Sequence, residues 1–183
     1  MEIFMYYTAH YTSPVGALTI AANETSITGL WIDGQKYYAA TLPDKVQCDE
    51  QHPILVNAKL WLDRYFSGRK PKSSELSIAP VGSEFRQIVW KILCETPYGE
   101  VITYGEIARR AAAQMVKVSM SAQAVGGAVG HNPISIIIPC HRVVGTNGSL
   151  TGYAGGIEKK IALLELEGID AKPFFIPKKG TAL

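Results

Sequence analysis

The feature that most constrains this fold is a change in hydrophobic pattern near residue 80. Before it, apolar residues form short runs separated by turn residues, at Phe4–His10, Leu18–Ala22 and Ile27–Ile32. Such runs predict the strands of an antiparallel meander, and the spacing in Pro53–Phe66 predicts one helix. After it, apolar residues recur mainly at helical spacing, which predicts a second domain built from helices.

The chain is therefore expected to have an α+β fold in two domains. Residues 1–80 form an N-terminal α/β domain with an antiparallel sheet, and a polar linker is expected at about 76–83. Residues 84–170 form a mainly helical domain, and residues 171–183 form a C-terminal tail. At 183 residues the chain is long enough to bury a core in each of two small domains.

Four helices and one strand are predicted in the second domain. Ser83 and Thr103 are expected N-caps, Glu106 is expected to complete a capping box, and Gly168 to follow the last helix as a C-cap. Two helices joined by a short loop and followed by a β-segment are typical of a helix-turn-helix with a wing, although many helical cores that do not touch DNA share this pattern. The predicted helices are Ser83–Cys94, Tyr104–Ala113, Ser121–Gly130 and Ile157–Glu167, and the predicted strand is Ile134–Ile138.

The composition is that of an ordinary globular protein, and the net charge of +2 does not by itself indicate a nucleic-acid binder. Three widely separated cysteines argue against a secreted disulfide framework, and neither they nor the histidines have zinc-ligand spacing. Cys48 and Cys94 are interpreted as core residues. Because no signal-peptide pattern and no apolar run of membrane length is found, we expect a cytoplasmic protein without membrane contact.

The stretch from residue 132 to 145, NPISIIIPCHRVVG, contains the most reactive candidate. Pro139 cannot donate a ladder hydrogen bond, so the preceding strand should end there and place Cys140 at its end. Positive charge from His141 and Arg142 would favour the thiolate, which is the nucleophilic form of cysteine. His141, next to the thiol, is the natural general base. The stretch therefore predicts a nucleophilic cysteine.

The string PCHRV at 139–143, with Asn132 and Pro133 before it and YAGG at 153–156 after it, closely resembles the O6-alkylguanine-DNA alkyltransferases, also called methylated-DNA–protein-cysteine methyltransferases. The resemblance covers residues 84–169 strongly. Residues 1–80 are similar to the N-terminal domain of the bacterial members through the strings SPVGALTIAAN and GLWIDGQKY. The family's fold implies a ribonuclease-H-like N-terminal domain and a winged helix-turn-helix C-terminal domain that binds DNA and carries the acceptor cysteine.

The resemblance implies DNA repair by direct reversal, in which the alkyl group of O6-alkylguanine passes irreversibly to Cys140. O4-alkylthymine is a further candidate substrate. His141 would take the thiol proton through a water molecule, and Glu167 would orient His141. The S-alkyl product is not hydrolysed, so each molecule would act once. No metal and no cofactor are implied, the partner would be double-stranded DNA carrying alkylated guanine, and a monomer is expected.

The resemblance also implies residues that bind the DNA and the damaged base. Tyr104 would press on the DNA backbone and help to rotate the nucleotide outwards, because the target oxygen cannot be reached inside the base stack. The backbone carbonyls of Cys140 and Val143 and the backbone N–H of Ala154 would read the guanine edge. Tyr153 would line the alkyl pocket.

Two further residues complete this set, and several members have simpler interpretations. Asn132 would tie the DNA-binding helix to the active-site segment, and Arg142 is grouped with the residues that contact DNA. Alone, Tyr104 suits a core tyrosine, Glu167 a solvated helix-end charge, and Asn132 a turn residue before proline. Their joint spacing with the PCHR string favours the functional interpretation.

The sequence departs from the family pattern in two places. Gln123 occupies the position of the arginine that enters the duplex and fills the gap left by the flipped base. Glutamine lacks the charge but can hydrogen-bond the orphaned base. The segment AAAQMVKVSMSA, residues 111–122, is longer than in many relatives and adds either a DNA contact through Lys117 or a longer turn.

Two other functions are compatible with parts of this pattern. A non-enzymatic protein that senses alkyl lesions in DNA would resemble the alkyltransferase-like proteins, but these lack the acceptor cysteine. A cysteine hydrolase would use Cys140 and His141 in turnover, but the helix-turn-helix context argues against it. The presence of Cys140 therefore favours the alkyltransferase.

Gln123→Arg should tighten binding to duplex DNA and steepen its salt dependence, because the added cation releases a further counterion from the backbone. Affinity measured across a salt titration, for the variant and the wild type, tests this. Identical affinities at every salt concentration would show that Gln123 does not occupy the expected position.

Overall fold

The computed structural model describes residues 5–178. Contacts divide the chain into two units. The first contains Met1–Val81 together with Pro133–Ile137, and the second contains Gly82–Asn132 and Ile138–Leu183. The start of the expected strand Phe4–His10 and residues 179–183 of the expected tail lie outside the described residues.

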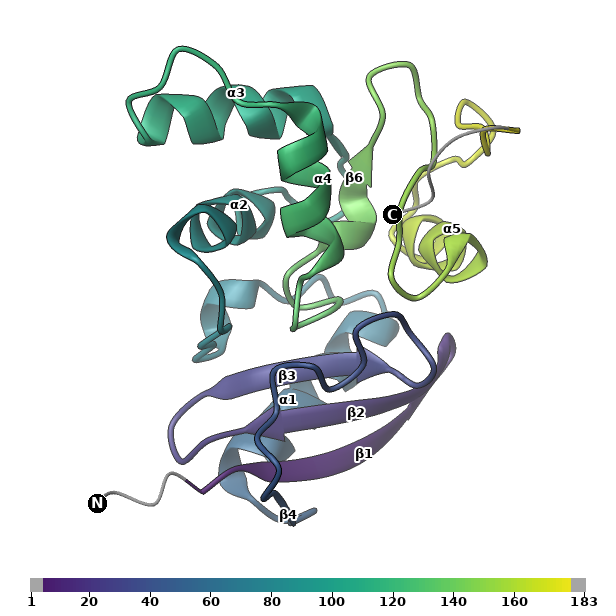
Figure 1. Cartoon of the computed structure of the whole chain (residues 1–183). Coiled ribbons are helices and arrows are strands. Elements are labelled where there is room, and N and C mark those ends of the chain that lie inside the picture. The colour runs from purple at the N-terminus through teal and green to yellow at the C-terminus, as the bar shows by residue number, and fades with distance from the viewer. Residues whose placement is uncertain (1–4, 179–183) are drawn as a thin grey trace. The chain divides into compact units, whose positions relative to one another are not determined.

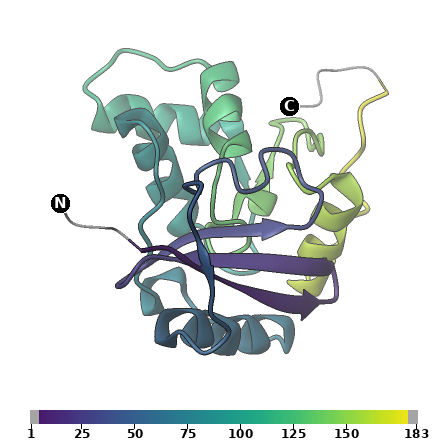
Figure 2. The ribbon, with the colours of Figure 1, turned by 60° about the horizontal axis from the view of Figure 1, so that its bottom comes forward.

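The first unit is built on a four-stranded sheet with the order β3-β2-β1-β4. β1 (Tyr7–Ser13), β2 (Gly16–Ala22) and β3 (Ile27–Ile32) form an antiparallel meander, as the sequence predicts. α1 (Pro53–Phe66) covers one face of this sheet (Figures 1 and 2). The three short apolar runs predicted as strands and the single predicted helix of the first half are therefore confirmed.

β4 (Gln47–Cys48) was not predicted. It pairs in parallel with β1, with Thr8 opposite Cys48, and it is too short and too polar to give a strand signal. The interpretation of Cys48 as a core residue is wrong, because its side chain is exposed on this edge strand. Cys94, at the end of α2 (Glu84–Cys94), is half-buried.

The free edge of β3 is covered by two irregular segments. Ile27 exchanges backbone hydrogen bonds with Ser77 and Ala79, and Leu30 does so with Pro133 and Ser135. Covering an edge in this way satisfies its backbone groups and blocks pairing with other chains. The predicted strand Ile134–Ile138 is therefore wrong: this buried stretch makes one isolated bridge to β3, followed by turns in the first unit.

The second unit contains three helices that pack on one another, α2, α3 (Tyr104–Gln114) and α4 (Ala122–Gly130) (Figure 1). Each begins at a hydroxyl residue whose side chain accepts a backbone N–H of the first turn. These N-caps are Ser83, Thr103 and Ser121. The predicted helices at these positions and the predicted N-caps Ser83 and Thr103 are confirmed. The expected capping box is wrong, because the carboxylate of Glu106 bonds Arg109 and Arg110 instead. No helix among residues 5–178 is long and apolar enough to cross a membrane.

A short parallel pair and a last helix complete the second unit. β5 (Ile102–Thr103) pairs with β6 (Val143–Val144), and α5 (Ile157–Leu166) ends before Gly168, whose φ of 81° is left-handed. The first part of the expected tail is packed: Phe175 accepts a backbone hydrogen bond from Leu150 and donates one to Gly148. A 3-10 turn, Ser73–Glu75, lies in the first unit.

The indole of Trp90 on α2 is a central contact of the second unit. It is buried, and its Nε1 donates a hydrogen bond of 2.9 Å to the carbonyl of Ala128 on α4. We expect Trp90→Ala to lower the free energy of unfolding by about 3–5 kcal/mol, because it leaves a cavity and an unpaired carbonyl. Urea unfolding measures this. Val101→Ala, at an exposed position of the same unit, is the control, and an equal effect of the two would contradict the prediction.

Candidate active site

Cys140 begins a single turn of 3-10 helix, Cys140–Arg142, that follows Pro139. Its backbone N–H donates to the carbonyl of Ile138 at 2.8 Å, and the N–H of Arg142 donates to Pro139. The expectation that the thiol lies at the end of a strand is therefore wrong. The chain instead turns tightly at the proline, and the thiol is 4% exposed.

The surroundings of this thiol act on its pKa in opposite directions. Burial raises the pKa of Cys140, while a hydrogen bond from the side chain of Asn132 and the charge of Lys160 lower it. The sequence suggested that His141 and Arg142 would supply the positive charge. In the structure Lys160 supplies it, and burial is the largest influence, so the resting thiol is kept protonated.

The carboxylate of Glu167 is the centre of the polar network behind the thiol. Its Oε1 lies 2.6 Å from Nε2 of His141. Arg142 donates to both carboxylate oxygens, from Nε at 2.9 Å and from Nη2 at 3.0 Å. The backbone N–H of Gly99 donates to Oε2 at 3.0 Å. A buried carboxylate with this many donors is held in one orientation.

These contacts determine the charges of the network. Burial raises the pKa of Glu167, but the hydrogen bonds and charges of His141 and Arg142 outweigh it and lower the value to about 2. Burial lowers the pKa of His141, and Glu167 opposes this fall. At neutral pH the carboxylate is thus ionised and the imidazole neutral, which is the form that can accept a proton.

Arg142 requires a correction, because it was grouped with the residues that contact DNA. Its side chain is buried, and its remaining donor, Nη1, bonds the carbonyl of Thr96 at 2.6 Å. The guanidinium also lies over the ring of Tyr98, 5.8 Å from the centroid. A guanidinium held in this way orients Glu167 and is not available to a phosphate.

Lys160 is a residue of this site that the sequence reasoning missed. It is fully buried on α5, and its Nζ donates to the carbonyls of Val143, at 2.5 Å, and Thr151, at 3.1 Å. Burial lowers its pKa to about 8. Within residues 5–178 no carboxylate pairs with it. The available signal was its position three and four residues before Leu163 and Leu164, on the apolar face of the helix.

Tyr104 and Tyr153 also lie near the thiol. Tyr104, the first residue of α3, donates its hydroxyl to the carbonyl of Thr151 at 3.1 Å. Burial, and then the charge of Cys140, raise the pKa of Tyr104 to about 12, and the same causes raise that of Tyr153 well above its ordinary value. Among the described residues the hydroxyl of Tyr153 has no hydrogen-bond partner. Both phenols therefore stay protonated and can donate.

The other predicted residues are distributed around this centre. The side chain of Asn132, just past α4, donates to the carbonyl of Ile138 at 2.8 Å. Gln123 is exposed in the first turn of α4. Ala154 is half-exposed. The carbonyls of Cys140 and Val143 already accept hydrogen bonds, from the N–H of Val143 and from Lys160, which leaves each one lone pair for a ligand.

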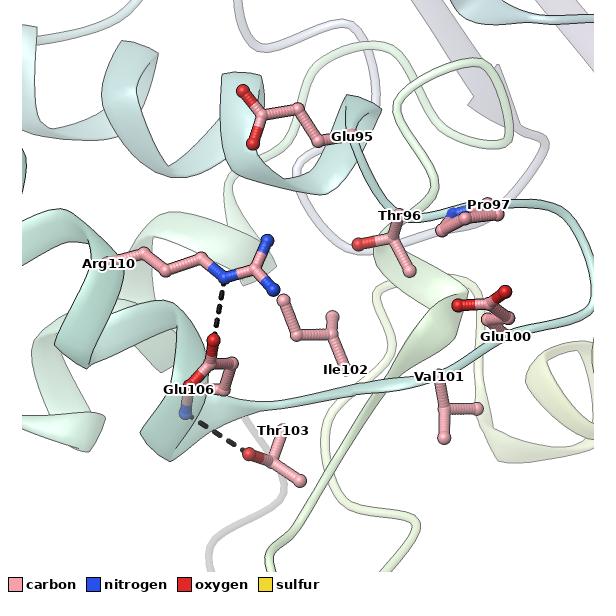
Figure 3. A pocket seen from close by; sticks show the side chains of 9 residues that line it. All are labelled: Glu95, Thr96, Pro97, Glu100, Val101, Ile102, Thr103, Glu106 and Arg110. Atoms are coloured by element: carbon pink, nitrogen blue, oxygen red, sulfur yellow. Dashed lines mark hydrogen bonds and ion pairs between the residues drawn. The ribbon is translucent and has the colours of Figure 1, made fainter.

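A pocket of about 270 Å³ opens elsewhere in the second unit (Figure 3). Its wall is acidic, and Figure 3 shows Glu106 held by Arg110 and by the N-cap Thr103. Neither Cys140 nor a tyrosine lines it, so it is not where an alkylated base would meet the thiol. It is lined by Glu95, Thr96, Pro97, Glu100, Val101, Ile102, Thr103, Glu106 and Arg110.

One group of side chains in the first unit could hold a metal ion. The pairing of β1 with β4 brings ligand atoms of His10, Cys48 and Glu50 within 4.8 Å of one another, which their sequence spacing did not reveal. However, the carboxylate of Glu50 forms an ion pair with Lys59 and accepts the backbone N–H of His10. A neighbouring ammonium disfavours a cation there.

Glu167→Gln tests the network. The pKa of Glu167 is lower in the folded protein than its ordinary value of 4.5, so its ionised form stabilises the fold above about pH 4.5, and this stability is lost as the pH falls to about 2. At neutral pH we expect the variant to lose about 3–5 kcal/mol, because Arg142 is left buried without its partner. The difference in free energy of unfolding should shrink across the acidic range. A difference independent of pH, or one matched by exposed Glu165→Gln, would contradict this.

Two family models match this chain. The DNA-binding domain of 6-O-methylguanine DNA methyltransferase matches residues 84–169, and its ribonuclease-like domain matches residues 5–80. The methylated-DNA–protein-cysteine methyltransferase of Haemophilus influenzae is 43% identical over 182 residues, which is 95% of this chain and 97% of that protein. That of Methanosarcina acetivorans is 42% identical over 90% of this chain and 99% of its own length.

Solved structures give the same relationship. The O6-methylguanine methyltransferase of Mycobacterium tuberculosis superposes with a TM-score of 0.75 and 41% identity, over 89% of this chain and 93% of that one. A structure of the same organism's OGT in complex with DNA superposes with a TM-score of 0.76 and 40% identity, over 93% and 94% of the two chains. The chain therefore belongs to the O6-methylguanine-DNA methyltransferases, the methylated-DNA–protein-cysteine methyltransferases.

Proposed function

We propose that this protein repairs double-stranded DNA by moving the alkyl group of O6-alkylguanine to Sγ of Cys140. The observation that carries the proposal is the buried thiol of Cys140, next in the chain to a neutral imidazole that Glu167 holds at 2.6 Å. Family membership and the match of residues 84–169 to a DNA-binding domain support DNA as the carrier of the substrate.

In the reaction, Sγ attacks the alkyl carbon from the side opposite O6. The S–C bond forms, the C–O6 bond breaks, and its electron pair goes to the guanine. The thiol proton passes to His141, through a water molecule, and the resulting imidazolium is stabilised by the carboxylate of Glu167. The guanine takes up one proton to become the neutral base. The products are a repaired guanine and an S-alkylcysteine.

Other buried groups of the site have roles in this step. The ammonium of Lys160 lowers the pKa of Cys140 and so stabilises the thiolate as it forms. Tyr104 and Tyr153 remain protonated. The hydroxyl of Tyr153, which has no partner among the described residues, can donate to the base as negative charge develops on it, and that of Tyr104 would do so after leaving the carbonyl of Thr151. The free lone pairs of the Cys140 and Val143 carbonyls would accept the N–H groups of the guanine edge.

The protein acts once. The sequence contains nothing that would return Cys140 to a thiol, because a thioether is not opened by a general base and water under the conditions that hydrolyse a thioester. The step needs no electron transfer, and the side chains described here supply both the nucleophile and the base.

All of these groups come from one unit of one chain, which supports a monomer as the acting form. It would work in the compartment that holds the DNA, which in bacteria is the cytoplasm.

Incubation with a duplex that contains one O6-methylguanine should add the mass of one CH₂ to the intact protein, located by peptide mapping on Cys140. Transfer should stop at one group per molecule. Cys140→Ala should bind the same duplex without any gain in mass. Exposed Cys48→Ala should still be methylated. A wild-type protein that binds the lesion without gaining mass would indicate a lesion sensor, and the proposed transfer would be wrong.

A further inference from the structure

Residues 115–120 form the loop that joins α3 to α4 (Figure 1). This loop contains two exposed apolar side chains. Val116 is 94% exposed and Val118 is 106% exposed, more than any other large apolar side chain of the described residues. Single exposed apolar residues are common on protein surfaces. Two valines this exposed within three residues instead indicate a surface that contacts another molecule.

The backbone at the start of this loop is fixed to the end of α3. Val116 has a φ of 54°, in the left-handed region that β-branched residues avoid. The turn is fixed to the end of α3, because the N–H of Val116 bonds the carbonyl of Ala113 at 3.3 Å and that of Lys117 bonds Ala112 at 2.9 Å. Val116 is therefore held by the helix end in an exposed position, and Val118 follows it two residues later.

The charge pattern around the loop suits a polyanion. From residue 107 to residue 157 the chain contains no aspartate and no glutamate. The cations in and before the loop are Arg109 and Arg110, which form ion pairs with Glu106, and Lys117. Lys117 lies between the two valines and is exposed. A loop without acidic side chains does not itself repel phosphates, and an exposed lysine can neutralise one.

The loop is also continuous with the surface of α4. Exposure continues through the N-cap Ser121 into the first helical turn, where Ala122, Gln123 and Ala124 are all exposed. Both the loop and the helix lie inside the segment that matches a DNA-binding domain. Because the loop and the helix belong to the segment that matches a DNA-binding domain, and because the loop carries a lysine and no acidic residue, duplex DNA is the partner that fits it.

We propose that the loop 115–120 is a second DNA-contacting element beside α4, in which Lys117 contacts a backbone phosphate and Val116 and Val118 lie against the deoxyribose faces that line a groove. Proteins that bind the minor groove also place apolar side chains against the DNA, there as wedges between base steps. This inference rests on the proposed function, since it takes DNA as the partner, but it concerns affinity and not the transfer of the alkyl group.

The test measures binding to an undamaged duplex by fluorescence anisotropy over a range of salt concentrations. Val116→Ser with Val118→Ser should weaken binding roughly tenfold at each salt concentration, because apolar contact area is lost without loss of charge. Lys117→Ala should weaken binding and reduce the slope of log affinity against log salt by about 0.9, the value for one phosphate contact. Val46→Ser, at an exposed position of the first unit, is the control and should bind as the wild type does.

The outcomes separate this inference from the proposed function. Methyl transfer from O6-methylguanine supplied as the free base does not need the DNA-binding surface, so the loop variants should keep the wild-type rate. If the valine variant and Lys117→Ala bind duplex DNA as the wild type does, the inference is wrong even where transfer proceeds. If the wild type binds DNA through the loop but transfers no methyl group, the proposed function fails and the inference stands. Loss of self-association in the valine variant, with DNA affinity unchanged, would make the loop an interface between copies and overturn the inference.

Discussion

The carboxylate of Glu167 is the interaction on which the rest of the site depends. A buried carboxylate is stable only when donors replace its lost hydration, and here His141, Arg142 and Gly99 supply them. Because His141 and Arg142 directly follow Cys140, fixing their side chains also fixes the 3-10 turn that contains the nucleophile. The carboxylate of Glu167 thus positions the general base His141 and the 3-10 turn, and through the turn it positions the thiol of Cys140.

The sequence predicted the parts of the fold that local physics determines. The N-caps Ser83 and Thr103 were recognisable because a hydroxyl before an amphipathic run satisfies the first free N–H groups of a helix. The meander followed from short apolar runs with turn residues between them. Cys140 and His141 were named from a motif and Glu167 from the family resemblance, and the structure places His141 and Glu167 in contact although they are 26 positions apart in the chain.

The predictions that were wrong or missing have one cause: each feature depends on contacts between segments far apart in the sequence. An apolar run such as Ile134–Ile138 has the composition of a strand, yet its partner is the edge of β3 about a hundred residues earlier, where two hydrogen bonds satisfy it. Arg142 looked like a phosphate contact because arginine usually is exposed, and only the position of Glu167 shows otherwise. Lys160 escaped notice because a buried lysine is rare, so a helix pattern alone does not suggest one.

The balance of forces on Cys140 suits a residue that reacts only once. An exposed thiolate would react with any electrophile, and each such event would inactivate a molecule that has no means of regenerating its thiol. Burial raises the pKa of Cys140 and excludes such reagents, while Lys160, Asn132 and the neutral imidazole of His141 keep deprotonation accessible. The nucleophile is therefore formed when a substrate fills the site and the proton can pass to His141. Selectivity for the lesion then comes from the protein that surrounds the thiol, since a permanently ionised cysteine would not discriminate between alkylating agents.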